Sequence, residues 1–346
     1  MLELFPARTI GPFGRRQRHA RGGKIPVTVV TGFLGAGKTT LVRRFLATEE
    51  GRGTAVVVNE FGAEGIDDAL IRTSTDETVL LGNGCLCCTA RTDLQVALRA
   101  LVADRARGAV PHFRRVVIET SGLADPGPVL QTFATDRALG GEFHLELAVA
   151  LVDAETALAT LAWSAEARKQ VILADRLIVT KVDVAGTALA ERVEERLRAL
   201  NPHAPIERAI FGRIDPQSLV AAPAPPMAGG AGARGFVAEA AHSDGIASFV
   251  LAQEAPMPWA PFARAMDVLT SLRGPDLLRV KGFVAVEGCQ GPVLVQFVQH
   301  LADAPVELQA WPDGRRGTRL VFITRNLPER VVRDLFAAVQ AVAAPP

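Results

Sequence analysis

The sequence predicts an α/β fold with a mostly parallel sheet, followed by a smaller C-terminal α+β domain. Three observations support this prediction. Short β-branched, apolar segments alternate with segments of helical spacing over residues 25–220. A glycine-rich loop joins the first predicted strand to the first predicted helix. A stretch rich in Ala, Pro and Gly then begins at residue 221, and we expect a linker over residues 221–241 before a second domain at 242–346.

The glycine-rich loop matches the phosphate-binding pattern G-x-x-x-x-G-K-[ST]. A β-branched strand, residues 25–30, precedes it, and a helical pattern starting at residue 41 follows, which is the context of a P-loop NTPase. The glycines let the backbone wrap around phosphate oxygens, and the loop amides point at the anion. Lys38 is expected to reach the β- and γ-phosphates as a catalytic residue, and the Thr39 hydroxyl to bind Mg²⁺. The predicted nucleotide-binding residues of this loop are Gly32, Gly35, Ala36, Gly37, Lys38, Thr39 and Thr40.

The overall charge gives no reason to expect a nucleic-acid or membrane partner. The 346 residues carry a formal net charge of +1, and no apolar run approaches the ~20 residues of a membrane span. Residues 1–24 contain five arginines without an apolar core, which indicates a basic flexible tail rather than a secretory signal.

Three of the four cysteines fall in one short segment, as Cys85, Cys87 and Cys88. The segment lies between a predicted strand at 78–81 and a helical pattern that starts at Leu94. Three thiolates on a tight loop form a soft ligand set for Zn²⁺ or a similar metal, with the fourth position open. Inert buried cysteines and a redox thiol cluster are the alternatives. Neighbouring reduced thiols also favour a cytoplasmic location.

A predicted strand at 115–118 leads into Glu119, with Gly122 three residues later. Glu119 is expected to act on Mg²⁺ directly or through water, and the Gly122 amide to sense the γ-phosphate. An earlier predicted strand, 54–58, runs into the acidic, glycine-punctuated segment 59–68, which is a candidate switch.

The segment Thr180-Lys181-Val182-Asp183 differs at one position from the guanine-reading pattern Asn-Lys-x-Asp. Asp183 can accept hydrogen bonds from both the ring N–H and the exocyclic amine of guanine, whereas adenine has a ring acceptor and no amine at that edge. The Lys181 stem can pack on the base. Thr180 replaces the usual Asn, and we expect weaker packing of the phosphate loop there.

The remaining predicted elements complete the two domains. In the first domain they are strands at 147–153 and 176–179, a helix over 154–173, and a helix-and-strand unit over 189–209. In the second they are strands at 246–251, 277–286, 292–299 and 318–323, with helices at 259–272 and 328–342. No site chemistry is evident in the second domain, where His300 and Trp311 are interpreted as packing residues.

Taken in order, these motifs resemble the CobW-type GTPases, P-loop metal chaperones that include zinc chaperones and nitrile hydratase activators. The resemblance runs from about Ile25 to the C-terminus. In the first domain the resemblance depends on residues 32–39, 59–62, 85–88, 119–126 and 181–183. In the second domain it depends on residues 277–282 and 319–323.

The resemblance implies slow GTP hydrolysis coupled to binding and delivery of a divalent metal, Zn²⁺ or Co²⁺, to a client metalloprotein or metal-insertion enzyme. It assigns the metal site to Cys85, Cys87 and Cys88, and the magnesium-binding acid to Glu119. Two features depart from the family. Ala63 stands where an acidic residue is usual, with Glu64 one place later, and the linker lacks a His-rich stretch.

The mechanism predicted from the sequence joins the two sites. Mg·GTP orders segments 59–68 and 119–125, the cysteine loop closes on the metal, and hydrolysis releases it. The sequence does not choose a general base, although Asp67 or Asp68 could position water. The alternatives are a P-loop kinase or ATPase with incidental thiols and a non-enzymatic zinc sensor. We expect a monomer or homodimer.

Overall fold

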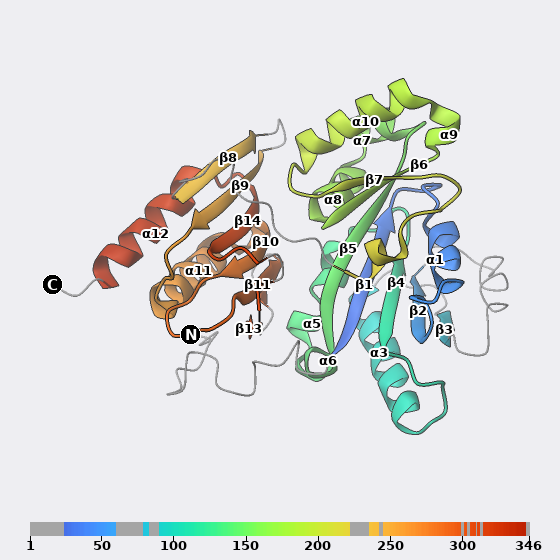
Figure 1. Ribbon diagram of the computed structural model, residues 1–346, viewed down its shortest axis with the longest axis horizontal. Coiled ribbons are helices and arrows are strands. Elements are labelled where there is room, and N and C mark those ends of the chain that lie inside the picture. The colour runs from blue at the N-terminus through green and yellow to red at the C-terminus, as the bar shows by residue number, and fades with distance from the viewer. Residues whose placement is uncertain are drawn as a thin grey trace. The chain divides into compact units, whose positions relative to one another are not determined.

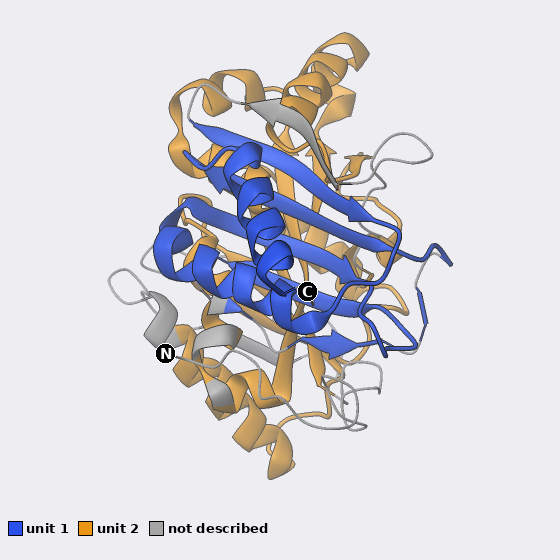
Figure 2. Cartoon of the chain, turned by 90° about the vertical axis from the view of Figure 1, so that its left-hand side faces the viewer, with its two compact units in different colours: residues 1–23, 224–346 blue, residues 24–223 orange. Residues whose placement is uncertain are grey.

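The computed structural model describes residues 24–59, 79–82, 90–221, 235–241, 245–298, 301–302, 305–308, 310–311 and 314–343. The chain divides into two compact units, residues 24–223 and residues 224–346 (Figure 2). Among the described residues, no helix is long and apolar enough to cross a membrane.

The first unit is built on a parallel sheet, as predicted. Within the described residues its seven strands are ordered β3-β2-β4-β1-β5-β6-β7 (Figure 1). Both faces of such a sheet are covered, which explains why its strands are continuous apolar runs. The strands are β1 (Ile25–Gly32), β2 (Thr54–Asn59), β3 (Val79–Gly82), β4 (Arg115–Thr120), β5 (Phe143–Asp153), β6 (Arg176–Thr180) and β7 (Ile206–Ala209).

Helices pack on this sheet through apolar side chains. Helix α1 buries Leu41, Val42 and Phe45 in one core with Val30 of β1 and Val117 of β4. The helical elements of the unit are α1 (Lys38–Leu46), α3 (Ala90–Ala106), α4 (Gly127–Leu130), α5 (Thr132–Thr135), α6 (Arg137–Glu142), α7 (Ala157–Trp163), α8 (Ala165–Leu173), α9 (Val182–Ala185), α10 (Thr187–Leu200) and the 3₁₀ helix η3 (Pro216–Leu219).

The single helix predicted over 154–173 is two helices in the structure. Ser164 separates them: its backbone is extended, and its hydroxyl accepts a hydrogen bond from the Ala167 N–H at 3.1 Å. A serine at an N-cap accepts a hydrogen bond from an N–H group that has no carbonyl partner in the first turn of its helix. The new helix therefore begins after Ser164, and the previous one ends before it.

The second unit is an antiparallel sheet ordered β12-β11-β10-β14-β9-β8 among the described residues, with β13 also paired to β11. Helices α11 and α12 lie on one face of it (Figure 2), where Phe262, Met266 and Phe336 pack against strand residues. Its elements are β8 (Gly235–Ala241), β9 (Ile246–Gln253), α11 (Trp259–Arg273), η4 (Gly274–Asp276), β10 (Leu277–Val284), β11 (Val293–Val298), β12 (Leu301–Ala302), β13 (Val306–Glu307), β14 (Thr318–Arg325) and α12 (Glu329–Ala343).

Strand β8 corrects the expected extent of the linker. It occupies Gly235–Ala241, the last part of the range 221–241, and pairs antiparallel with β9, Phe236 opposite Leu251. The Ala-rich sequence of β8 gives little strand signal, so its state depends on the neighbouring strand. Residues 222–234 lie outside the described residues.

Candidate nucleotide site

The phosphate loop leaves the sheet at the carboxyl end of β1, where Gly32 passes close to β5. A Cβ on Gly32, at φ +141°, would overlap the carbonyl oxygen of Leu151, so only glycine fits there. Gly35 and Gly37 also have positive φ, at +75° and +88°, and Gly37 lies immediately before α1. The loop therefore takes a conformation that its glycines permit, at a helix N-terminus where backbone N–H groups can bind an anion.

Lys38 is buried within this loop. Its Nζ donates to the Gly32 carbonyl at 3.0 Å and to the Phe33 carbonyl at 3.2 Å. These two bonds hold the positively charged amine of Lys38 within the phosphate loop, together with the oriented backbone N–H groups of that loop. That donor set fits the triphosphate of a nucleotide.

Thr39 and Glu119 are brought into direct contact. The Thr39 hydroxyl donates to Glu119 Oε1 at 2.6 Å, and only 4% of Glu119 is exposed. The contact arises because β4 pairs directly with β1, Glu119 opposite Val30, so the two strands end side by side. A hydroxyl oxygen beside a carboxylate is a donor set that fits Mg²⁺, and these two residues would hold it.

The loop that follows β4 packs against the phosphate loop. A Cβ on Gly122 would come within 2.7 Å of the Leu34 nitrogen, so the two backbones approach too closely for a side chain. Gln170 of α8 donates through Nε2 to the Gly122 carbonyl at 3.1 Å and to the Ala124 carbonyl at 3.0 Å. Gln170 was not predicted from the sequence, because nothing in a helical segment distinguishes it from other polar helix residues.

The predicted base-reading segment begins at the end of β6. Lys181 has φ +57°, and its Nζ pairs with Asp153 Oδ2 at 2.7 Å, while Asp183 is exposed on α9. Asp153, at the end of β5, is a second residue that sequence reasoning missed. Its position at a strand end beside β6 is the signal that could have identified it.

Thr180 contacts the phosphate loop directly. Its hydroxyl lies 2.9 Å from the Ala36 carbonyl, to which it donates, so β6 is tied directly to the phosphate loop. A hydroxyl on a short side chain suffices here because β6 ends close to Ala36.

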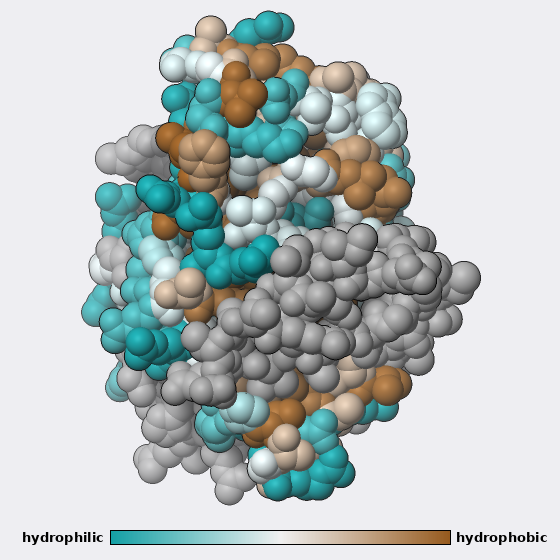
Figure 3. Space-filling view, turned by 90° about the vertical axis from the view of Figure 1, so that its right-hand side faces the viewer, coloured by the Kyte–Doolittle hydropathy of each residue, from teal (hydrophilic) through white to brown (hydrophobic). Residues whose placement is uncertain are grey.

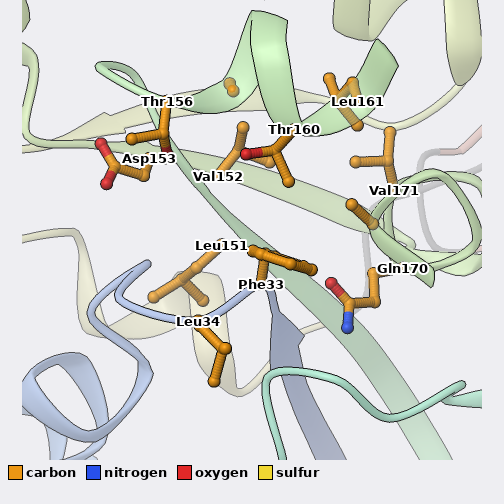
Figure 4. A pocket seen from close by; sticks show the side chains of 12 residues that line it. Phe33, Leu34, Leu151, Val152, Asp153, Thr156, Thr160, Leu161, Gln170 and Val171 are labelled. Atoms are coloured by element: carbon orange, nitrogen blue, oxygen red, sulfur yellow. The ribbon is translucent and has the colours of Figure 1, made fainter. Parts of the chain in front are cut away.

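A small cavity of about 20 Å³ lies between the phosphate loop, β5 and helices α7 and α8. Phe33 and Leu34 line one side of it, and Thr160, Leu161 and Gln170 line the other (Figure 4). Its size is that of about one water molecule, so it does not admit a nucleotide.

The outer surface near the loop is partly apolar. Leu34, Leu123 and Trp163 are all exposed large apolar residues. Figure 3 shows a wider face on which brown apolar patches alternate with teal polar ones.

Several predicted site residues lie outside the described residues. They include the three cysteines of the proposed metal site, Cys85, Cys87 and Cys88, and the switch residues 60–68 with Ala63, Glu64, Asp67 and Asp68. His300 is also outside. Within the described part of the chain, no group of three or more His, Cys, Asp or Glu side chains is placed to hold a metal.

Comparisons with known proteins agree with this geometry. Residues 26–208 match the CobW/HypB/UreG nucleotide-binding domain, and residues 246–340 match the cobalamin synthesis protein CobW C-terminal domain. The chain is 36% identical over 329 residues to the zinc chaperone YjiA of Escherichia coli, covering 91% of this chain and 99% of that protein. It is 31% identical to the zinc chaperone CobW of Pseudomonas aeruginosa, covering 90% of each.

A solved structure extends the likeness to the fold. The crystal structure of Zn(II)-bound YjiA GTPase from E. coli superposes with a TM-score of 0.64 at 32% identity, covering 91% of this chain and 99% of that one. The match includes both units of the chain. The chain belongs to the CobW/HypB/UreG family and carries the CobW C-terminal domain.

Proposed function

We propose that this protein is a GTP-dependent metallochaperone that binds a divalent metal, with zinc favoured over cobalt, and delivers it to a client metalloprotein. The main support for GTP hydrolysis is the hydrogen bond between Thr39 and Glu119, which lies beside the phosphate loop that holds Lys38. The names of its relatives, zinc chaperones and a GTPase, support the metal and the nucleotide.

The reaction is hydrolysis of the bond between the β- and γ-phosphates by water, giving GDP, inorganic phosphate and a proton. Lys38 holds positive charge where negative charge accumulates on the phosphates, and the loop amides bind their oxygens. Thr39 and Glu119 would hold Mg²⁺, which would neutralise negative charge on the phosphates. Gly122 presents its backbone to the third phosphate, so this loop distinguishes GTP from GDP.

Cargo binding is assigned to Cys85, Cys87 and Cys88. Three thiolates bind zinc tightly but leave one position for a client ligand, which suits a metal that must leave. Ordering of segments 59–68 and 119–125 around GTP links this site to the nucleotide, and by linkage the metal tightens GTP as much as GTP tightens the metal.

A zinc titration tests the coupling. Zinc affinity is measured with a non-hydrolysable GTP analogue and with GDP, in the parent protein and in a Cys85→Ser/Cys87→Ser variant, with Cys289→Ser as the matched control. In the parent and in the Cys289→Ser control, we expect zinc to bind more tightly with the GTP analogue than with GDP. In the Cys85→Ser/Cys87→Ser variant, we expect no such difference. Equal affinity in both nucleotide states contradicts the coupled mechanism.

Nucleotide preference separates this function from a kinase or ATPase. Asp183→Asn should lower the preference for GTP over ATP by on the order of 100-fold, since Asn keeps one acceptor oxygen but turns an NH₂ group toward the second guanine donor. Asp334→Asn, the same change on an exposed residue of α12, is the control. A parent protein that prefers ATP would support the ATPase alternative, and zinc-dependent GTP binding without turnover would support the sensor.

A further inference from the structure

Helix α8 presents two consecutive polar side chains, Lys169 and Gln170, to the loop after β4. Gln170 is 1% exposed, and its Nε2 donates to the Gly122 and Ala124 carbonyls at 3.1 and 3.0 Å. Lys169 pairs with Asp125 Oδ2 at 2.7 Å. The helix therefore holds the loop at three residues, through the carbonyls of Gly122 and Ala124 and the side chain of Asp125.

The two contacts differ in strength. Lys169 and Asp125 have side chains 43% and 37% exposed, so water and salt screen their attraction. The bonds of Gln170 are buried, and a buried carbonyl that loses its donor bears a desolvation cost. Gln170 is accordingly the main attachment of the loop to α8.

The two carbonyls also fix the orientation of the Gln170 amide. Only its NH₂ group can donate to them, and a flipped amide would place oxygen against oxygen. In Figure 4 the amide nitrogen points away from Phe33 and the oxygen lies on the side of Phe33, where Gln170 lines the small cavity. The loop therefore fixes one orientation of the Gln170 amide, with its NH₂ group toward the two carbonyls.

The same loop touches the phosphate loop at its other side. Gly122 packs against the Leu34 backbone, while Phe33 contacts Trp163 edge to face with ring centroids 5.6 Å apart. Trp163 is the last residue of α7, and Ser164 joins it to α8. The pair α7–α8 thus contacts the nucleotide site at two places, through Trp163 at the junction of the helices and through Gln170 within α8.

We propose that Gln170 is a positioning residue for GTP, which sets the backbone of the Gly122 loop against the phosphate loop and couples the third phosphate to helices α7 and α8. This inference rests on the proposed function of the site as a GTPase. Gln170 does not touch the nucleotide. It acts through Gly122 and Ala124, so its removal affects GTP far more than GDP, which lacks the γ-phosphate.

Two variants test this role. Gln170→Leu removes the donor with little change in volume, and Gln170→Glu keeps the shape but turns an acceptor toward the two carbonyls. We expect roughly a tenfold loss in the ratio of GTP-analogue to GDP affinity and a similar fall in kcat, as two lost hydrogen bonds imply. GDP affinity should change much less, whereas the KM for GTP should rise in step with the lost GTP affinity.

The control is Gln253→Leu, the same substitution at a side chain that donates to the Ala255 carbonyl in the other unit. It should leave both affinities unchanged. Thermal unfolding identifies a variant that fails to fold, and the inference then depends on the other variant. Equal losses of GTP-analogue and GDP affinity in a folded Gln170 variant would overturn the proposal, since they indicate a merely structural role.

Trp163 gives a second readout. The chain has three tryptophans, so Trp259→Phe and Trp311→Phe leave Trp163 as the single reporter. We expect its emission to differ between GDP and the GTP analogue, and Gln170→Leu to remove most of that difference. An undiminished difference contradicts the coupling through Gln170.

These measurements remain informative if the proposed function fails. Absence of GTP turnover in the parent protein, with Mg²⁺ and zinc present, would refute the GTPase function. The affinity ratio and the Trp163 signal require only binding, so they still decide whether Gln170 positions the loop.

Discussion

The two sheets of this chain use their buried polar residues in different ways. In the parallel sheet of residues 24–223, strands β1, β4, β5 and β6 end on one side, where Glu119 bonds to Thr39 and Thr180 bonds to Ala36 of the phosphate loop. In the antiparallel sheet of residues 224–346, neighbouring strands end at opposite edges. Parallel topology gathers strand-end residues, whereas antiparallel topology separates them.

Buried charges in the second unit serve its own fold. Arg319, 2% exposed, donates to the Arg315 carbonyl at 3.2 Å and lies 5.8 Å from the Phe283 ring centroid. Glu307 Oε1 accepts from the Gln290 N–H at 3.0 Å. Buried charges therefore indicate a ligand site at the parallel sheet and internal support of the fold in the antiparallel sheet. Paired substitutions, one in each sheet, can separate these roles.

The largest effect is expected at the phosphate loop. Lys38→Ala should weaken GTP binding by about 100-fold or more, because charge-assisted bonds to phosphate are lost. Lys281→Ala in β10 makes the same change in the other sheet and should leave binding intact. Fluorescent-nucleotide titration measures both, and similar losses in the two variants would remove the contrast between the sheets.

A second pair compares buried carboxylates. Glu119→Gln should reduce GTP turnover by roughly 100-fold while GDP still binds, since the change removes a charge expected to hold Mg²⁺. Glu307→Gln should keep turnover near the parent rate. Phosphate release at saturating Mg²⁺ distinguishes them, and normal turnover in Glu119→Gln excludes the role assigned to that carboxylate.

Two glycines with no room for a Cβ form the third pair. Gly282→Ala would overlap the Arg319 carbonyl at φ +152° and should lower the free energy of unfolding by about 3 kcal/mol. Gly122→Ala presses on Leu34 and should reduce GTP turnover at a smaller cost to stability. Thermal melts and turnover together test this, and loss of turnover in both folded variants would contradict it.

The last prediction concerns pH. Burial lowers the pKa of His203 from 6.5 to about 4, so its ring stays neutral in the folded state while the unfolded chain takes up a proton below 6.5. Unfolding free energy should therefore be highest above pH 6.5 and fall by about 3 kcal/mol toward pH 4. Chemical denaturation of parent and His203→Gln from pH 7 to 4 measures it, and an identical pH dependence would contradict the assignment.

Much of the site could be predicted because its residues sit in local patterns. Lys38 and Thr39 belong to one short motif, and Glu119 follows a recognisable strand. Gln170 could not be predicted, since its partners lie 46 and 48 residues away and α8 has an ordinary helical sequence. Strand β8 was not predicted for a related reason: its own residues give little strand signal, and its state depends on pairing with β9.

The sequence alone determined the order of strands and loops and the chemistry carried by each strand end, because side-chain period and glycine placement act over a few residues. Only the tertiary structure decided which ends meet. The strand order puts β4 beside β1, so that Glu119 contacts Thr39, and puts β6 within reach of Ala36 for Thr180. Such contacts depend on how the whole chain buries its apolar surface, which no single segment specifies.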